Sequence, residues 1–220
     1  AQYKADASQL SIEEVLYAAT LTDNAAEKKD IYTTATRLYP NDYRAYNNLA
    51  TLAIAEGNLT ATEKYLSQAA EKNANAPEIN ANLALLALAK GNISQVETYA
   101  ARATTAKNYN EVIGNLNMFT GNYAQAAQTL KGCKTNSAAL AQILAKDYAA
   151  AAQTLANVPN QDATTSYLKA IVAARTNNNS AVLSNLRDAF AKDASFKAMA
   201  AKDLEFAALF GDAAFQNLVR

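Results

Sequence analysis

The sequence predicts an all-α protein, and its composition gives three reasons. Alanine, the residue with the highest helix propensity, supplies 52 of the 220 residues, whereas there are only six glycines and three prolines. The β-branched residues that favour strands are sparse. Half of the residues are hydrophobic and 18% are charged, so we expect a packed core rather than a disordered chain. No apolar run reaches the roughly 18 residues of a membrane-spanning helix, and we expect no direct membrane insertion.

Charge and reactive side chains exclude several classes of function. Twenty basic residues balance twenty acidic ones, so the basic surface that binds nucleic acid is missing. The chain has no histidine, which excludes Ser-His-Asp and Cys-His catalysis and every histidine-containing zinc site. A single cysteine, Cys133, cannot form an internal disulfide or a four-cysteine metal site. There is no glycine-rich phosphate loop and no spaced carboxylate pair. We therefore predict no catalytic, cofactor-binding or metal-binding residue, no cofactor, and no enzyme activity.

The sequence repeats itself every 34 residues. Asn48-Leu49-Ala50 returns as Asn82-Leu83-Ala84, and the frame also fits one period earlier, from Val15 to Pro40. Each unit is predicted to contain two helices of about 12 to 15 residues. The chain breaks between them at turn-forming dipeptides that share one place in the period, namely Asp23-Asn24, Gly57-Asn58 and Gly91-Asn92.

These residues resemble the signature of the tetratricopeptide repeat family. In the second unit the seven signature places are taken by Tyr46, Leu49, Ala50, Ala53, Gly57, Leu66 and Ala69. In the third unit they are taken by Asn80, Leu83, Ala84, Ala87, Gly91, Ala100 and Ala103. Asn80 departs from the usual aromatic residue, and Thr62 from the usual alanine. The resemblance implies a right-handed solenoid of antiparallel helix pairs with a terminal cap.

Later units become shorter. A step of 30 residues carries the third unit onto the fourth, and a further step of 25 carries residues 122–130 onto 147–155 with seven of nine residues identical. A sixth helix pair is expected over about 163–192, and the phenylalanine-rich tail from Ser195 is expected to cap the array. We predict a single superhelical domain over residues 1–220. Full-length repeats occupy about 9–108, shortened repeats about 109–160, and the last repeat and cap about 161–220.

The sequence also supports a separate prediction at each of three single residues. Pro77 is expected in the first turn of its helix, where a missing N–H is harmless. Cys133 falls at a small-residue place of the fourth unit, and we expect it to be a buried, unreactive filler. The chain begins at Ala1 rather than methionine, as expected of a mature form or a part of a longer protein.

The resemblance also implies where a partner binds. In this family the first helices of successive repeats line a concave groove that holds extended peptides or partner helices. The groove-facing places are occupied here by Glu13, Tyr17, Arg44, Asn47, Asn48, Thr51, Glu78, Asn82, Leu85, Leu88, Glu111, Asn115 and Met118.

Asn48 and Asn82 share one place in the repeat frame, and two interpretations of them stay open. Their amides could hold the backbone of an extended peptide, or they could bond neighbouring helices or water. The carboxylate-clamp version of the family is disfavoured, because Glu13 and Glu78 stand where its lysines would be and would repel a carboxylate. A mixed, mildly polar groove instead suits a peptide of some basic character or a helix with one apolar stripe.

The function predicted from these features is a non-catalytic scaffold that binds a protein or peptide partner. One alternative is a self-assembling structural module of a larger cell-envelope protein, whose partner would be a second copy of the chain in a weak homodimer. Another is the regulatory module of an enzyme whose catalytic part lies outside this sequence. The segment from Leu38 to Leu49 is most similar to repeats of bacterial cell-envelope proteins. This suggests a location in the periplasm or cell envelope, the alternative being the cytoplasm.

Overall fold

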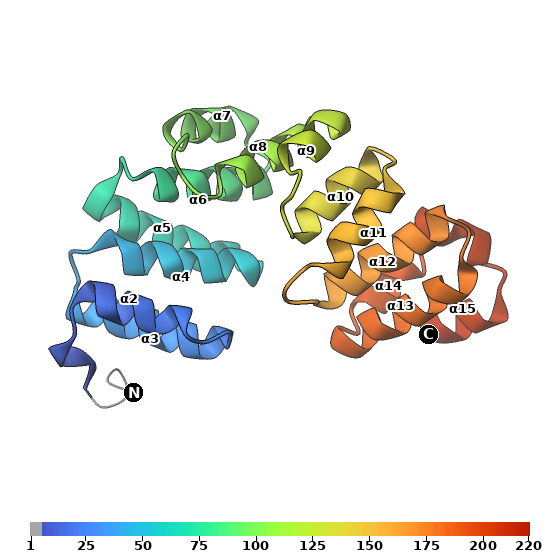
Figure 1. The fold of residues 1–220 in the computed structure, drawn as a ribbon, viewed down its shortest axis with the longest axis horizontal. Helices are drawn as coiled ribbons and strands as arrows, with labels where there is room; N and C mark the ends of the chain where they lie inside the picture. The colour runs from blue at the N-terminus through green and yellow to red at the C-terminus, as the bar shows by residue number, and fades with distance from the viewer. Residues whose placement is uncertain (1–5) are drawn as a thin grey trace. The chain divides into compact units, whose positions relative to one another are not determined.

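The computed structural model describes residues 6–220 and divides the chain into two compact units, Ala1–Val112 and Ile113–Arg220. The described residues form helices and no strand, so the all-α prediction is confirmed (Figure 1). No helix among them is long and apolar enough to pass through a lipid bilayer. The single domain that the sequence predicts over the whole chain stays a prediction, and each unit is described by itself.

The first unit contains three consecutive helix pairs, which follow the 34-residue period. A short 3-10 helix, η1 (Ala7–Gln9), precedes them. The pairs are α2 (Ile12–Thr20) with α3 (Ala25–Leu38), α4 (Tyr43–Ala55) with α5 (Leu59–Asn73), and α6 (Pro77–Ala89) with α7 (Ile93–Arg102). Helix α8 (Tyr109–Phe119) begins at the end of this unit and continues into the second.

The predicted turn dipeptides form the breaks within the second and third pairs. Gly57 and Gly91 have positive φ angles of 68° and 72°, a conformation that glycine adopts without steric cost. The next residues, Asn58 and Asn92, cap α5 and α7 by accepting a hydrogen bond from a backbone N–H in the first turn. Pro77 stands at the first position of α6, as predicted.

Small residues lie where the helices of the first unit cross. Ala50, Ala69 and Ala103 are each fully buried, and they allow neighbouring backbones to approach closely. The two polar residues that depart from the family signature form hydrogen bonds with nearby backbone carbonyls. Buried Asn80 donates to the carbonyls of Ala74 and Ala76, and buried Thr62 donates to the carbonyl of Asn58.

The second unit continues the pairing with shorter helices. It contains the remainder of α8, and then α9 (Tyr123–Thr129), α10 (Asn136–Leu144), α11 (Tyr148–Ala156), α12 (Ala163–Arg175) and α13 (Asn179–Lys192). The expected sixth helix pair is present as α12 and α13. The turns within these later helix pairs also contain a residue with a positive φ angle. This residue is Gly121, Lys146 or Asn177, with φ values of 79°, 64° and 57°.

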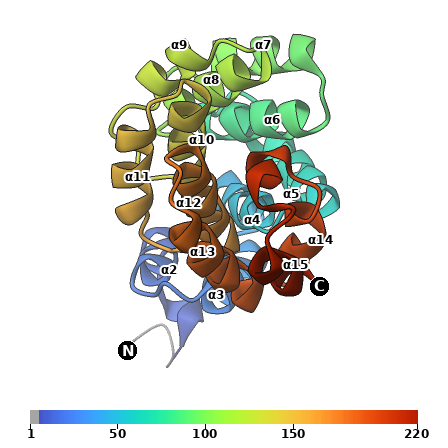
Figure 2. The same ribbon diagram turned by 90° about the vertical axis from the view of Figure 1, so that its right-hand side faces the viewer.

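The tail folds over the last helix pair. It consists of α14 (Phe196–Ala200), η2 (Leu204–Leu209) and α15 (Ala213–Val219), and both ribbon views place α14 and α15 beside α13 (Figure 2). Phe206 and Phe215 are buried in one cluster with Tyr167, whose hydroxyl donates to Asp203 at 2.7 Å. Arg175 of α12 also donates twice to the carboxylate of Glu205, both at 2.6 Å.

The prediction that Cys133 is buried is wrong, whereas its low reactivity stays a prediction. Cys133 lies in the turn after α9, where its backbone N–H bonds the carbonyl of Leu130, and its side chain is only partly buried. Helix α9 ends at Thr129, so Cys133 follows in the turn, from where its side chain packs against the edge of the cluster that contains Leu130. The predicted small-residue place therefore lies outside the shortened helix.

Candidate functional site

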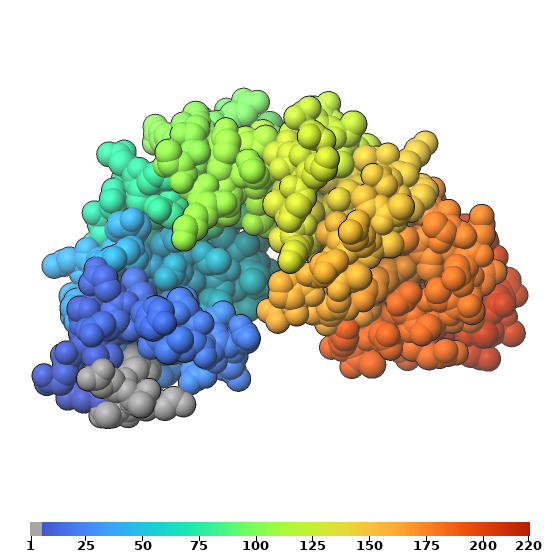
Figure 3. Space-filling view, in the orientation of Figure 1, coloured from blue at the N-terminus to red at the C-terminus, as the bar shows by residue number. Residues whose placement is uncertain are grey.

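A cavity of the first unit is lined by the first helices of its pairs and by the segment entering α8. Its volume is about 600 Å³, and we call it the first-unit pocket. The space-filling view shows the hollow between the blue atoms of α2 and the green atoms before α8 (Figure 3). The lining residues are Leu16, Tyr43, Arg44, Asn47, Asn48, Thr51, Ile54, Ala55, Glu78, Asn82, Leu85, Lys107, Asn108 and Glu111.

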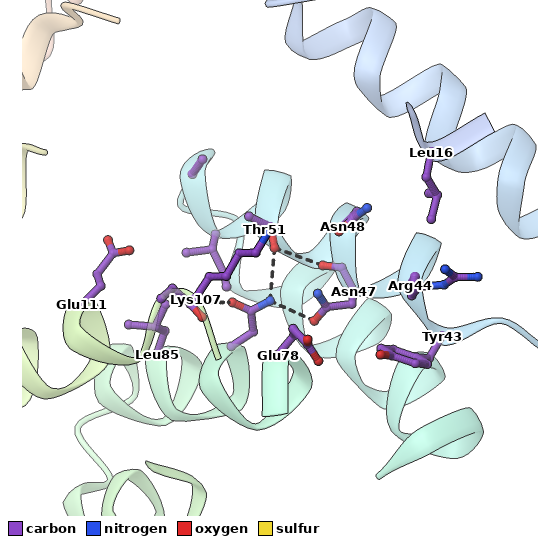
Figure 4. Close-up of a pocket in the computed structure, with 14 residues that line it drawn as sticks. Leu16, Tyr43, Arg44, Asn47, Asn48, Thr51, Glu78, Leu85, Lys107 and Glu111 are labelled. Atoms are coloured by element: carbon purple, nitrogen blue, oxygen red, sulfur yellow. Dashed lines mark hydrogen bonds between the residues drawn. The ribbon is translucent and has the colours of Figure 1, made fainter. Parts of the chain in front are cut away.

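A buried amide network forms one wall of this pocket (Figure 4). Asn82 Nδ2 donates to Asn47 Oδ1 at 2.9 Å and to Thr51 Oγ1 at 3.1 Å. Asn82 Oδ1 in turn accepts from Asn108 Nδ2 at 3.3 Å. Asn82 is 3% exposed, and its bonds connect α4, α6 and the segment before α8, the bond to Asn47 being fully buried. They fix the spacing of three successive repeats at the pocket wall.

The two asparagines of the repeated place differ in their surroundings. The amide of Asn82 is fully engaged by neighbouring helices, which is one of the two interpretations that the sequence left open. Asn48 lines the pocket half-buried, and its side chain has no hydrogen-bond partner among residues 6–220. Asn48 is therefore the one of the two whose amide is available to a ligand.

Arg44 is occupied by neighbouring carboxylates. Its Nη2 lies 2.7 Å from Asp42 Oδ2 and 2.9 Å from Glu13 Oε1, and its Nε also donates to Asp42. Hydrogen bonds from Arg44 hold the pKa values of Asp42 and Glu13 below their usual range. The guanidinium thus ties α2 to the start of α4 and adds no unpaired positive charge to the pocket.

The carboxylates of Glu78 and Glu111 have no such partner. Neither side chain forms an ion pair or a hydrogen bond within the described part of the chain. Glu78 is exposed, whereas Glu111 is half-buried, and burial raises the pKa of Glu111. Unpaired negative charge therefore borders a cavity that also has apolar lining residues.

The structure brings together eight of the thirteen residues predicted for the groove. These eight are Arg44, Asn47, Asn48, Thr51, Glu78, Asn82, Leu85 and Glu111. That they bind a partner stays a prediction.

The other five lie outside the pocket lining. Glu13 is exposed and bonds Arg44 from α2, and Tyr17 is 63% exposed on the same helix. Leu88 is half-buried on α6. Asn115 and Met118 are half-buried in the second unit, where Met118 packs against the cluster that contains Leu130.

The repeat frame did not predict six of the lining residues, and the sequence contains a pattern that could have indicated only some of them. Ile54 and Ala55 lie three and four positions after Thr51, so helical periodicity alone could have placed them on its face. Lys107 and Asn108 come from an irregular segment before α8 with no repeat place to mark them. Leu16 and Tyr43 complete the set.

Known proteins resemble the chain in structure and not in sequence. No family model matches it, and no curated protein sequence matches it. A tetratricopeptide repeat protein from Parabacteroides merdae superposes with a TM-score of 0.56 at 13% identity, covering 87% of this chain and 82% of the other. PilF from Pseudomonas aeruginosa gives a TM-score of 0.52 at 14% identity, covering 94% of this chain and 100% of PilF.

A third solved structure is PilW, described as a widely conserved type IV pilus biogenesis factor. It superposes with a TM-score of 0.53 at 15% identity, covering 90% of this chain and 98% of PilW. The chain accordingly has the fold of the tetratricopeptide repeat solenoids, as the repeated residues predict.

Proposed function

We propose that the chain is a non-catalytic protein-interaction scaffold and that the first-unit pocket holds an extended segment of its partner. One observation carries this proposal: the amide of Asn48 lines a cavity of about 600 Å³ and has no partner among the described residues. A side-chain amide both donates and accepts, so it can bond the backbone of an extended peptide of any sequence.

The pocket's construction supports a binding role. Its wall is fixed by the Asn82 network, so little ordering of the protein is required when a ligand enters. Apolar side chains such as Leu16, Ile54 and Leu85 offer contact area beside the free amide.

A cell-envelope location belongs to this proposal. One of the similar structures, PilW, is described as a widely conserved type IV pilus biogenesis factor. The scaffold would then act in assembling an envelope complex. Fractionation of the native cells, with detection of the chain in periplasm, membrane and cytoplasm, tests the location.

The binding proposal is tested by selecting ligands from a library of random peptides displayed on phage. Affinities of the selected peptides are then measured for the wild type, Asn48→Ala, and Ala55→Trp, which places a large side chain in the cavity. We expect Asn48→Ala to weaken binding about tenfold, the effect of one to two lost hydrogen bonds. Ala55→Trp should abolish binding. The control is Lys64→Ala on the second helix α5, which does not line the pocket. Unchanged affinity for both pocket variants would overturn the proposal.

Self-association is the second candidate, and exposed apolar side chains in the second unit favour it. Phe119, Tyr123 and Leu144 are 58%, 39% and 37% exposed, although each is large and apolar. Light scattering after size exclusion tests this function directly. A dimer that Leu144→Lys converts to a monomer would support it, and a monomeric wild type at high concentration would reject it.

A further inference from the structure

We propose that the segment held in the first-unit pocket carries a lysine or arginine side chain, and that this cation pairs with Glu111. The inference rests on the binding role proposed above and adds the chemistry of the partner. It follows from the charges and neighbours of Glu111.

Glu111 has no positive partner within the described chain. Of the two basic residues that line the pocket, Arg44 is already bonded to both Asp42 and Glu13. Lys107 lines the same cavity, but no ion pair joins it to Glu111 in the described residues. A ligand cation would therefore meet an available carboxylate.

The surroundings of Glu111 make this pairing favourable. The side chain is half-buried, and burial raises its pKa because a carboxylate partly removed from water loses solvation. An ion pair at such a site is less screened by solvent than one on the open surface. A ligand cation would offset the lost solvation, whereas a ligand carboxylate would be repelled.

The shape of the lining favours a long basic side chain. Leu85 and Glu111 extend from neighbouring repeats on the same side of the close-up, and Ile54 belongs to the same lining (Figure 4). The methylene stem of lysine or arginine packs on apolar surface while its charged end reaches a carboxylate. Glu78, which is exposed, adds a second negative charge to the pocket and should contribute less because solvent screens it.

The test is a double-mutant cycle with peptides selected from the random library. For a selected peptide that contains lysine, a partner peptide replaces that lysine by norleucine, which keeps the stem and removes the charge. Affinities of both peptides are measured for the wild type and for Glu111→Gln. The matched control is Glu97→Gln, an exposed residue of α7 outside the pocket lining.

We expect the wild type and Glu97→Gln to prefer the lysine peptide about tenfold or more, in line with hydrogen bonds to charged groups. Glu111→Gln should remove this preference while binding the norleucine peptide as well as the wild type does. Peptides that bind the pocket without a preference for lysine would overturn the inference and leave the scaffold proposal standing. A preference that disappears in Glu78→Gln and persists in Glu111→Gln would also overturn it. If no pocket-dependent peptide is selected, the scaffold proposal itself fails.

Discussion

Asn82 of α6 donates a 2.9 Å hydrogen bond to the side-chain oxygen of Asn47 of α4, 35 residues earlier in the chain. Each side chain is less than 8% exposed, so this bond is made between repeats and out of contact with bulk water. It shows that the repeat array is held together by specific polar contacts as well as by buried alanines.

The first prediction is that Asn82→Ala destabilises the protein by about 1–3 kcal/mol, because it leaves the buried amide of Asn47 and the half-buried amide of Asn108 without this partner. Urea unfolding measures the change. Asn48→Ala is the control and should stay within about 0.5 kcal/mol, since Asn48 has no side-chain partner in the described chain. Equal effects for the two variants would contradict the network.

The second prediction concerns the helix crossings. Ala69→Phe should cost about 1–3 kcal/mol or more, because the fully buried alanine leaves no room for an aromatic ring between helices. Thermal unfolding provides the measurement. Ala101→Phe serves as the control, because Ala101 is exposed on α7. A melting temperature unchanged by Ala69→Phe would place this residue outside the interface.

The third prediction concerns Gly114 inside α8, a helix position where glycine is normally unfavourable. A β-carbon built there would lie 2.4 Å from Cγ of Leu130, so Gly114→Ala should destabilise the protein in spite of its better helix propensity. Gly211→Ala is the matched control, since nothing lies within 4 Å of its β-carbon. A gain in stability from Gly114→Ala, measured in urea, would mean that α8 and α9 pack less closely.

The fourth prediction concerns Lys146, a non-glycine residue with a φ angle of 64°. Lys146→Gly should stabilise the protein by about 1 kcal/mol, because glycine adopts this left-handed conformation without a steric penalty. Lys146→Ala separates conformation from charge, and it should give no such gain. If both variants behave alike in urea unfolding, the backbone is not the cause.

The fifth prediction is a pH effect at Glu111, whose pKa is raised by burial. The folded protein then holds this proton more tightly than the unfolded chain does. The contribution to stability is greatest below the unfolded pKa, and it is lost as pH rises through the folded pKa. Glu111→Gln should therefore be more stable than the wild type at pH 7, with a difference that shrinks on acidification. Unfolding free energies of the two proteins, compared across acidic and neutral pH, measure this difference. A difference that stays constant across that range would contradict the prediction.

The fold was predictable from sequence because its determinants are local and repeated. The alanine places, the glycine-asparagine turns and Pro77 each act within a few residues, and the 34-residue period aligns them. The shortening of the later repeats was also visible, since residues 122–130 and 147–155 are almost identical.

The candidate site was only partly predictable, because it depends on contacts between repeats. The frame gave Asn48 and Asn82 the same place, yet only Asn82 meets Asn47, Thr51 and Asn108. Asn47 and Thr51 lie on α4, and the places one period earlier, which would face Asn48, hold Glu13 and Tyr17. Asn108 comes from an irregular segment that has no counterpart in the period. The burial of Cys133 was predicted wrongly for a related reason. The repeat frame assumes a second helix that extends as far as Cys133, whereas α9 ends at Thr129.

The tail that covers α12 and α13 sets a limit on growth of the array. Phe206 and Phe215 occupy the apolar face on which a seventh helix pair would stack, and Arg175 and Tyr167 fasten that segment to α12. A second copy of the chain could stack there only by displacing two buried aromatic rings and a bidentate ion pair. Head-to-tail stacking of copies through this end is therefore disfavoured as long as the tail keeps these contacts.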